Sequence, residues 1–342
     1  MKFNCAQYEL GAVKNINWRP ILDRIIPMRF LAHRFIDLAF VLFGISIFVF
    51  LMIRLIPGDA VAVMLGANTE ITPERVAQLE RRLGLDKPIF EQYIFWIGNV
   101  LKGDLGTSIW TGRPVAQEIA ANFWPTIELT VLSVFFGSVF AIPIGCFMAE
   151  ARGKFSEIIV RTLAIAGLTV PSFWLGIVAI YITATLLPSV SFLGYVPFWE
   201  NPFENLKRMI LPVLALSLPM LANLSRLIRS AMLDAVKQEY IRTAVAKGAA
   251  RRRVVYVHAL RNALIPFTTA VGVSIGYLLG GAIVIEQVFA IPGLGQLVLG
   301  AIAERNYPLV QSSILVLTLI FVLVNFIVDI LYAIIDPRVT QK

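Results

Sequence analysis

Long apolar runs, separated by segments that hold most of the charges, make up the pattern of this chain. A helix that crosses a bilayer needs about 20 largely apolar residues. The runs predict six transmembrane helices, at residues 35–56, 128–149, 162–187, 209–229, 263–287 and 306–335. The predicted fold class is therefore all-α, a polytopic membrane protein with six spans.

Lys and Arg residues between the runs set the predicted orientation. Residues 1–34 hold six of them, and residues 226–261 hold nine against only Asp234 and Glu239. Short cation-rich segments stay on the cytoplasmic side of a membrane. The N-terminal lead (1–34), the C-terminus and the loop 230–262 between the fourth and fifth spans are therefore predicted to be cytoplasmic. The first run is expected to be an uncleaved anchor, because no small-residue cleavage site closes it.

The segments 57–127 and 288–305 are then external, and the first of them is expected to be partly helical. Thr72-Pro73 resembles a helix start, and Gly84 a helix end. A second helix, IFEQYIFWIGNVLK, is expected to follow Pro88 and to stop at Gly103. Its apolar strip is interpreted as packing on the other helices or the membrane interface rather than as a substrate site.

Composition strengthens the membrane interpretation. Hydrophobic residues make up 58% of the 342 and charged residues 15%, with a mean hydropathy of +0.76. Soluble domains carry about 25% charged residues. The net charge of +8 lies in segments that flank apolar runs, which indicates topology rather than nucleic-acid binding. Cys5 and Cys146 lie too far apart in the sequence to suggest a disulfide framework.

Three common motifs of nucleotide-binding, metal-binding and redox sites do not occur in the sequence. It contains no G-x-x-x-x-G-K-[ST], HExxH or CxxC, and we predict no catalytic, metal-binding or cofactor-binding residues and no enzyme activity. The glycine-rich stretch Pro292–Gly300 is interpreted as a turn at the outer rim. Two histidines, His33 and His258, offer little for a metal site.

Ionisable residues inside the predicted spans lie near their ends, where interfacial anchoring is the expected role. They include Asp37, Arg54, Glu128, Glu286 and Asp329. Ion-coupled carriers place such groups at membrane depth. If this chain transports a solute, the energy that drives transport is therefore expected to be supplied outside its membrane spans and not by ions bound within them.

The basic loop, residues 230–262, is the segment that is most informative about function. Ser230–Lys247 is rich in helix formers, Gly248 breaks the pattern, and a second helical stretch starts near Arg251 and runs into the next span. This projecting helix–glycine–helix segment, residues 239–253, is called the knob below. It could contact anionic lipid heads, nucleic acid or a soluble protein. Small residues at Thr243, Ala244 and Ala246 favour docking to a protein, with lipid contact as a secondary role.

The stretch RTAVAKGAARRRVVYVHALRNALIP resembles the EAA loop of permease subunits of binding-protein-dependent ABC importers, most closely their dipeptide, oligopeptide and nickel branch. Further segments resemble that branch in the same order. They are Arg54–Val61, Leu83–Val115, Val170–Gly176, Phe289–Gln311 and Asp329–Val339. The resemblance covers residues 34–339 and implies one transmembrane permease domain over 35–339.

The resemblance also implies that the loop docks into a groove of a cytoplasmic ATPase. The residues expected at this coupling site are Glu239, Arg242, Thr243, Ala244, Lys247, Gly248 and Arg251. Arg242, Thr243 and Ala244 occupy the EAA triplet, whose general consensus has glutamate at the first position, and Gly248 is the family glycine. Arg251, Arg252 and Arg253 are expected to face acidic or lipid groups.

The implied function is that of a permease in a bacterial inner membrane, forming half of a pathway for di- and oligopeptides. The implied partners are a second homologous permease, two cytoplasmic ATP-binding subunits that bind the ATP, an extracytoplasmic solute-binding protein and membrane lipids. Nickel complexes, glutathione and opine-like solutes remain alternative cargoes. A free-standing channel or facilitator, and a scaffold or lipid-interacting protein, remain alternatives of a different class.

Overall fold

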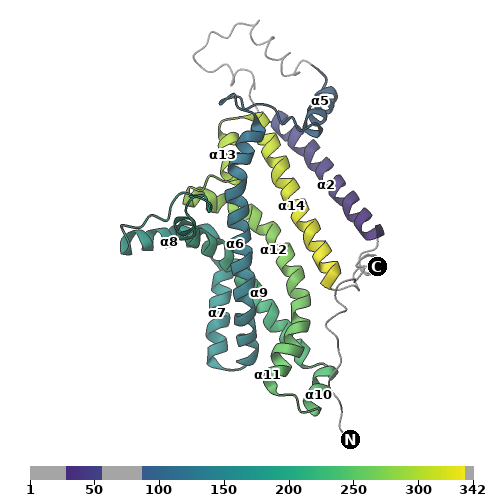
Figure 1. The fold of residues 1–342 in the computed structure, drawn as a ribbon, viewed down its shortest axis with the longest axis vertical. Helices are drawn as coiled ribbons and strands as arrows, with labels where there is room; N and C mark the ends of the chain where they lie inside the picture. The colour runs from purple at the N-terminus through teal and green to yellow at the C-terminus, as the bar shows by residue number, and fades with distance from the viewer. Residues whose placement is uncertain (1–27, 56–86, 336–342) are drawn as a thin grey trace, which may run out of the picture.

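The computed structural model describes residues 28–55 and 87–335, and its regular elements are helices (Figure 1). No β-strand occurs in these two ranges, although Thr107 and Pro114 form an isolated antiparallel bridge. The elements are α2 (Met28–Leu55), α5 (Ile89–Leu101), α6 (Val115–Glu150), α7 (Phe155–Thr169), α8 (Ser172–Leu186), α9 (Pro202–Val236), α10 (Glu239–Ala246), α11 (Arg251–Arg253), η2 (Val254–Ala259), α12 (Leu260–Phe289), α13 (Leu294–Ala303) and α14 (Tyr307–Ile335).

Five helices of the described ranges are long and apolar enough to cross a membrane, and the bent pair α7–α8 makes a sixth if it counts as one span. The all-helical membrane class predicted from the sequence is confirmed. Helix α6 packs along α9, and α12 packs on both, so these three helices form the centre of the bundle. Leu129, Leu224 and Ile285, one from each helix, are fully buried there.

The third apolar run does not form one straight span. The span predicted at 162–187 is bent, because α7 ends at Thr169 and α8 starts at Ser172 at an angle of 103° to it. Proline lacks a backbone N–H and disfavours helical geometry in the residue before it. Val170, before Pro171, is accordingly extended, with ψ 125°.

Helices α6 and α9 extend well beyond the apolar runs that predicted them. Helix α6 begins at Val115, not 128, because Val115 and Ile119 are buried in a second core shared with α13 and α14. Helix α9 begins at Pro202 rather than 209. Its N-cap residue Asn201 accepts a hydrogen bond of 3.1 Å from the backbone N–H of Glu204.

The predicted helix after Pro88 is confirmed as α5, whereas the one expected between Thr72 and Gly84 lies outside the described residues. The apolar strip of α5 packs on α2, because Tyr93 of α5 lies edge-on to Phe50 of α2, with ring centroids 5.2 Å apart. Arg54 of α2 was expected to anchor at the interface. Its guanidinium instead donates to Gln92 of α5, with an Nη2 to Oε1 distance of 2.6 Å.

Glu286, by contrast, is not an interfacial anchor, because its side chain is completely buried. Its carboxylate accepts a hydrogen bond from Thr126 Oγ1 of α6 at 2.6 Å and another from the backbone N–H of Gln296 at 3.0 Å. Thr126 Oγ1 in turn accepts from the backbone N–H of Leu294 at 2.8 Å. Two N–H groups in the first turn of α13 are thus satisfied by α6 and α12.

The stretch Pro292–Gly300 is therefore more than the predicted turn, since most of it belongs to α13. Apolar positions Leu294, Val298 and Ala301 follow helical spacing and are buried. Glu128, predicted to anchor near the same end, accepts a 2.6 Å hydrogen bond from Tyr195. Burial raises the pKa of the Tyr195 hydroxyl, and this hydrogen bond raises it further.

Asn306 ties the turn between α13 and α14 to the segment before α6. Its side chain, 1% exposed, donates from Nδ2 to Ser108 Oγ at 2.7 Å and accepts from the backbone N–H of Ile109 at 3.3 Å. A buried amide of this kind satisfies groups that water cannot reach. It holds together segments nearly 200 residues apart.

Replacing Asn306 with leucine is expected to lower the free energy of unfolding by about 1–3 kcal/mol, because buried partners lose their hydrogen bonds. The measurement is the midpoint of thermal unfolding of the purified protein in detergent. Asn325→Leu is the matched control, since the Asn325 side chain donates to Phe321 O of its own helix. Equal midpoints for the two variants would contradict this role of Asn306.

Candidate functional site

The basic loop forms the end of the bundle opposite α5 and α13 (Figure 1). The expected continuous helix over Ser230–Lys247 is wrong, because α9 ends at Val236 and α10 starts at Glu239. Gln238 between them is extended, with ψ 152°. The break allows Ile241, 3% exposed, to pack inward, so tertiary packing overrides the helical propensity of the segment.

Gly248 ends α10 as the sequence predicted. Its φ of +79° lies in the left-handed region, which favours glycine. The backbone N–H of Gly248 donates to Val245 O at 2.9 Å, and that of Ala249 donates to Ala244 O at 3.1 Å. These two bonds are those of a Schellman motif with glycine at the position after the cap. The turn therefore has a defined shape.

The predicted second helical stretch is confirmed from Arg251. It runs through α11 and a π-helical segment, η2, directly into α12. Val254, Val255 and Ala259 are buried on its inner side. Such π-helical insertions occur mostly as single turns within α-helices, frequently at functional sites. The loop is thus continuous with a long apolar helix.

Two contacts fix α10 to this second stretch. Helix α10 packs against η2, and its residue Ile241 is buried. Asn262 of α12 donates from Nδ2 to the hydroxyl of Tyr240 at 2.5 Å. A displacement of α10 would therefore be passed to α12 through packing and a hydrogen bond.

The predicted coupling residues gather on this one knob. Glu239 and Arg242 form an ion pair of 2.8 Å, with side chains 83% and 73% exposed. Thr243 Oγ1 donates to Glu239 O at 3.1 Å, and Ala244 is half-buried. Lys247, Gly248 and Arg251 are exposed. An exposed ion pair contributes little to stability, so these side chains are open to a partner.

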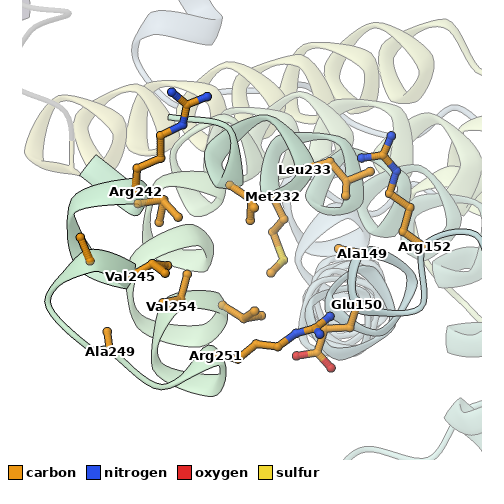
Figure 2. Close-up of a pocket in the computed structure, with 14 residues that line it drawn as sticks. Ala149, Glu150, Arg152, Met232, Leu233, Arg242, Val245, Ala249, Arg251 and Val254 are labelled. Carbon is orange, nitrogen blue, oxygen red and sulfur yellow. The ribbon is translucent and has the colours of Figure 1, made fainter. Parts of the chain in front are cut away.

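A cavity of about 830 Å³ lies between α10 and the ends of α6 and α9 (Figure 2). Apolar side chains make up most of its walls, and Arg152, Arg242, Arg251 and Glu150 also line it. Two of these arginines, Arg242 and Arg251, belong to the predicted coupling residues. Arg152 comes from the turn between α6 and α7.

Sequence reasoning missed Tyr240, Ile241 and Asn262 as residues that position the knob. Ile241 and Val245 follow the i, i+4 spacing of an amphipathic helix, and this signal could have identified the inner face of α10. The pairing of Tyr240 with Asn262 joins residues 22 positions apart and has no sequence signature. Within the described ranges, no group of three or more His, Cys, Asp or Glu residues is placed to hold a metal ion.

The sequence matches known families and relatives over most of its length. Residues 141–341 match the family described as binding-protein-dependent transport system inner membrane component, and residues 27–130 match its N-terminal part. The di/tripeptide transport system permease protein of Pseudomonas aeruginosa is 37% identical over 92% of this chain and 99% of its own length. The glutathione transport system permease protein of Escherichia coli O6:H1 is 36% identical over 92% of this chain and its own full length (100%).

The fold has a solved counterpart. The inward-facing MetNI methionine ABC transporter includes a chain that aligns with a TM-score of 0.53 and 20% identity. The alignment covers 65% of this chain and 97% of that one. By its sequence match over more than half its length, the chain belongs to the family of inner membrane components of binding-protein-dependent transport systems.

Proposed function

We propose that this chain forms half of the translocation pathway of an ATP-driven importer of di- and oligopeptides in a bacterial inner membrane. The observation that carries the proposal is the exposed knob of α10, held in a fixed shape at one end of an apolar bundle. The di/tripeptide permease of Pseudomonas aeruginosa, similar over nearly the whole chain, supports the cargo. A second homologous permease supplies the other half.

The movement that drives transport is transmitted to this chain through α10. In this proposal both termini and α10 are cytoplasmic, and the exposed residues around Arg242 and Gly248 dock into one of two ATP-binding subunits. ATP binds to and is hydrolysed by those subunits, while this chain contributes no catalytic group. Closure of the ATPase pair displaces α10, and its contacts with η2 and α12 pass the movement to the spans. Transport is then a shift between outward-open and inward-open states.

The opposite end of the bundle receives the cargo. Helix α5, helix α13 and the segment before α6 lie together there (Figure 1). Asn306 and Glu286 fix that surface through buried hydrogen bonds. An extracytoplasmic solute-binding protein docks on it and releases peptide into the pathway.

The test is uptake of a labelled dipeptide into cells that carry the transporter genes, with and without this chain. Uptake is expected to require this chain, the ATPase subunits and ATP. The same chain reconstituted alone in vesicles is expected to show no flux. Specific flux through the chain alone, without ATP, would instead identify a free-standing facilitator.

Glutathione is the second candidate cargo, because the Escherichia coli glutathione permease is 36% identical over 92% of this chain. The pathway of a permease need not discriminate among peptides when a binding protein selects them. Calorimetry of the cognate binding protein against a dipeptide, an oligopeptide and glutathione would separate the candidates. Binding of glutathione but neither peptide would replace the peptide proposal.

A further inference from the structure

The cavity beneath α10 has a chemistry that ATPase docking does not explain. We infer that it binds one acidic phospholipid from the adjacent leaflet, with its phosphate at the arginine rim and its acyl chains against the apolar walls. The argument rests on where the cavity lies, what lines it and which charges surround it.

Three apolar helices end at this cavity. Glu150 is the last residue of the candidate span Val115–Glu150, and Val236 is the last of Pro202–Val236. Arg251 is the first residue of the candidate span Arg251–Phe289. All three line the cavity. Of the three ends, that of α6 directly follows the apolar run 128–149, which has the length that crosses a bilayer, so the cavity wall at Glu150 lies near the lipid headgroups.

The walls are suited to hydrocarbon. Met232 and Leu233 of α9 face Val245 of α10 and Val254 of η2 across the cavity (Figure 2), and Val236 of α9 also lines it. Its volume of about 830 Å³ lies within the range of roughly 300–1,000 Å³ typical of ligand pockets. This space can take a headgroup and the upper part of its acyl chains. A soluble phosphate ester would leave the apolar walls uncovered.

The rim is suited to an anion. Arg152, Arg242 and Arg251 line the cavity together with a single carboxylate, that of Glu150, so the rim is net positive. The ion pair of Arg242 with Glu239 is exposed and therefore weak, which leaves its guanidinium able to bind a phosphate. Guanidinium groups bind phosphate through paired hydrogen bonds. Basic pockets between the cytoplasmic ends of membrane helices are suited to acidic headgroups.

A lipid in this place would touch α6, α9, α10 and η2 at once. It would fill the space behind α10 and hold the knob at a fixed distance from the spans. The membrane content of acidic lipid would then influence how firmly α10 is held.

The experiment counts lipid on the purified full-length transporter. The protein is equilibrated in nanodiscs made from equal parts of phosphatidylglycerol and phosphatidylcholine, transferred to detergent and analysed by native mass spectrometry. One tightly held phosphatidylglycerol per copy of this chain is expected. The double variant Arg152→Gln/Arg251→Gln is expected to lose it. The double variant Arg252→Gln/Arg253→Gln removes the same charge at neighbouring exposed positions that do not line the cavity, and is expected to keep it.

Leu233→Trp fills the cavity without changing charge and is also expected to abolish retention. Equal retention by the wild type, the cavity double variant and Leu233→Trp would overturn the inference. Displacement of the lipid by inorganic phosphate, or equal retention of phosphatidylcholine and phosphatidylglycerol, would also overturn it. The inference would fail as well if the isolated chain held the lipid but lost it when the ATPase binds. The last result would show that a protein segment occupies the cavity. Lipid is counted without reference to uptake, so failure here leaves the proposed function standing.

Discussion

Replacing Gly248 with valine is expected to reduce dipeptide uptake by about tenfold or more, while the chain still reaches the membrane. With φ at +79°, a residue with a β-carbon costs roughly 1–2 kcal/mol at this position, and 1.4 kcal/mol corresponds to a factor of ten. No atom lies within 4 Å of where that β-carbon would stand, so the effect comes from the backbone alone. The strained turn would move α10 out of position for docking.

Two variants serve as controls for this prediction. Gly248→Asn should retain most of the uptake, because asparagine tolerates left-handed geometry. Gly153→Val places the same strain, at φ +79°, in the turn between α6 and α7, again with no atom within 4 Å of its β-carbon. Labelled dipeptide uptake and co-purification of the ATPase are measured for each. Normal uptake by Gly248→Val with the ATPase still bound would refute the role of this turn.

A charge at Ala244 should act through contact with a partner instead of backbone strain. Ala244 is half-buried in α10 and accepts the Schellman hydrogen bond from Ala249. Ala244→Asp places a carboxylate where close approach to a partner is expected, and we expect it to abolish uptake. Because the backbone is unstrained there, Ala244→Ser should transport normally, and uptake is again the measurement. Wild-type uptake by Ala244→Asp would exclude close docking at this face.

Much of the fold follows from residue types that act locally. Apolar runs long enough to span a bilayer predicted the membrane helices, and Gly248 predicted the end of α10 because few other residues adopt its geometry. Pro171 lies inside the run that predicted the third span, and the chain turns by 103° there. The turn brings α8 against α9 and α12, and sequence periodicity alone does not reveal such packing.

The parts that sequence reasoning missed depend on contacts between distant segments. Glu286 lies near the end of an apolar run, so its position suggested an anchor exposed to the interface. Its burial follows from the return of α13, which brings the N–H of Gln296 to its carboxylate. The cavity likewise needs α6, α9 and α10 to meet, and Arg152 and Arg251 are 99 residues apart in sequence.

Removing the buried carboxylate of Glu286 is expected to lower the free energy of unfolding by about 3 kcal/mol. Hydrogen bonds to charged groups contribute roughly 1.5–3 kcal/mol each, and Glu286→Ala would leave Thr126 and the N–H of Gln296 without their acceptor. The side chain is fully buried, so water cannot replace it without a cavity. Helix α13 would detach from α6 and α12 first, since its first turn depends on these bonds. The thermal midpoint of the purified protein is the measurement.

Graded variants distinguish this role from a general effect of mutation in the bundle. Glu286→Gln keeps one acceptor oxygen and should lose about half as much stability as Glu286→Ala. Glu304→Ala removes an exposed carboxylate at the C-cap of α13, where Trp110 bonds only the backbone oxygen, and should leave the midpoint unchanged. If Glu286→Ala unfolds at the wild-type temperature, the carboxylate does not hold α13. Since α13 belongs to the surface proposed to receive the binding protein, loss of that carboxylate should impair peptide delivery even where ATPase binding persists.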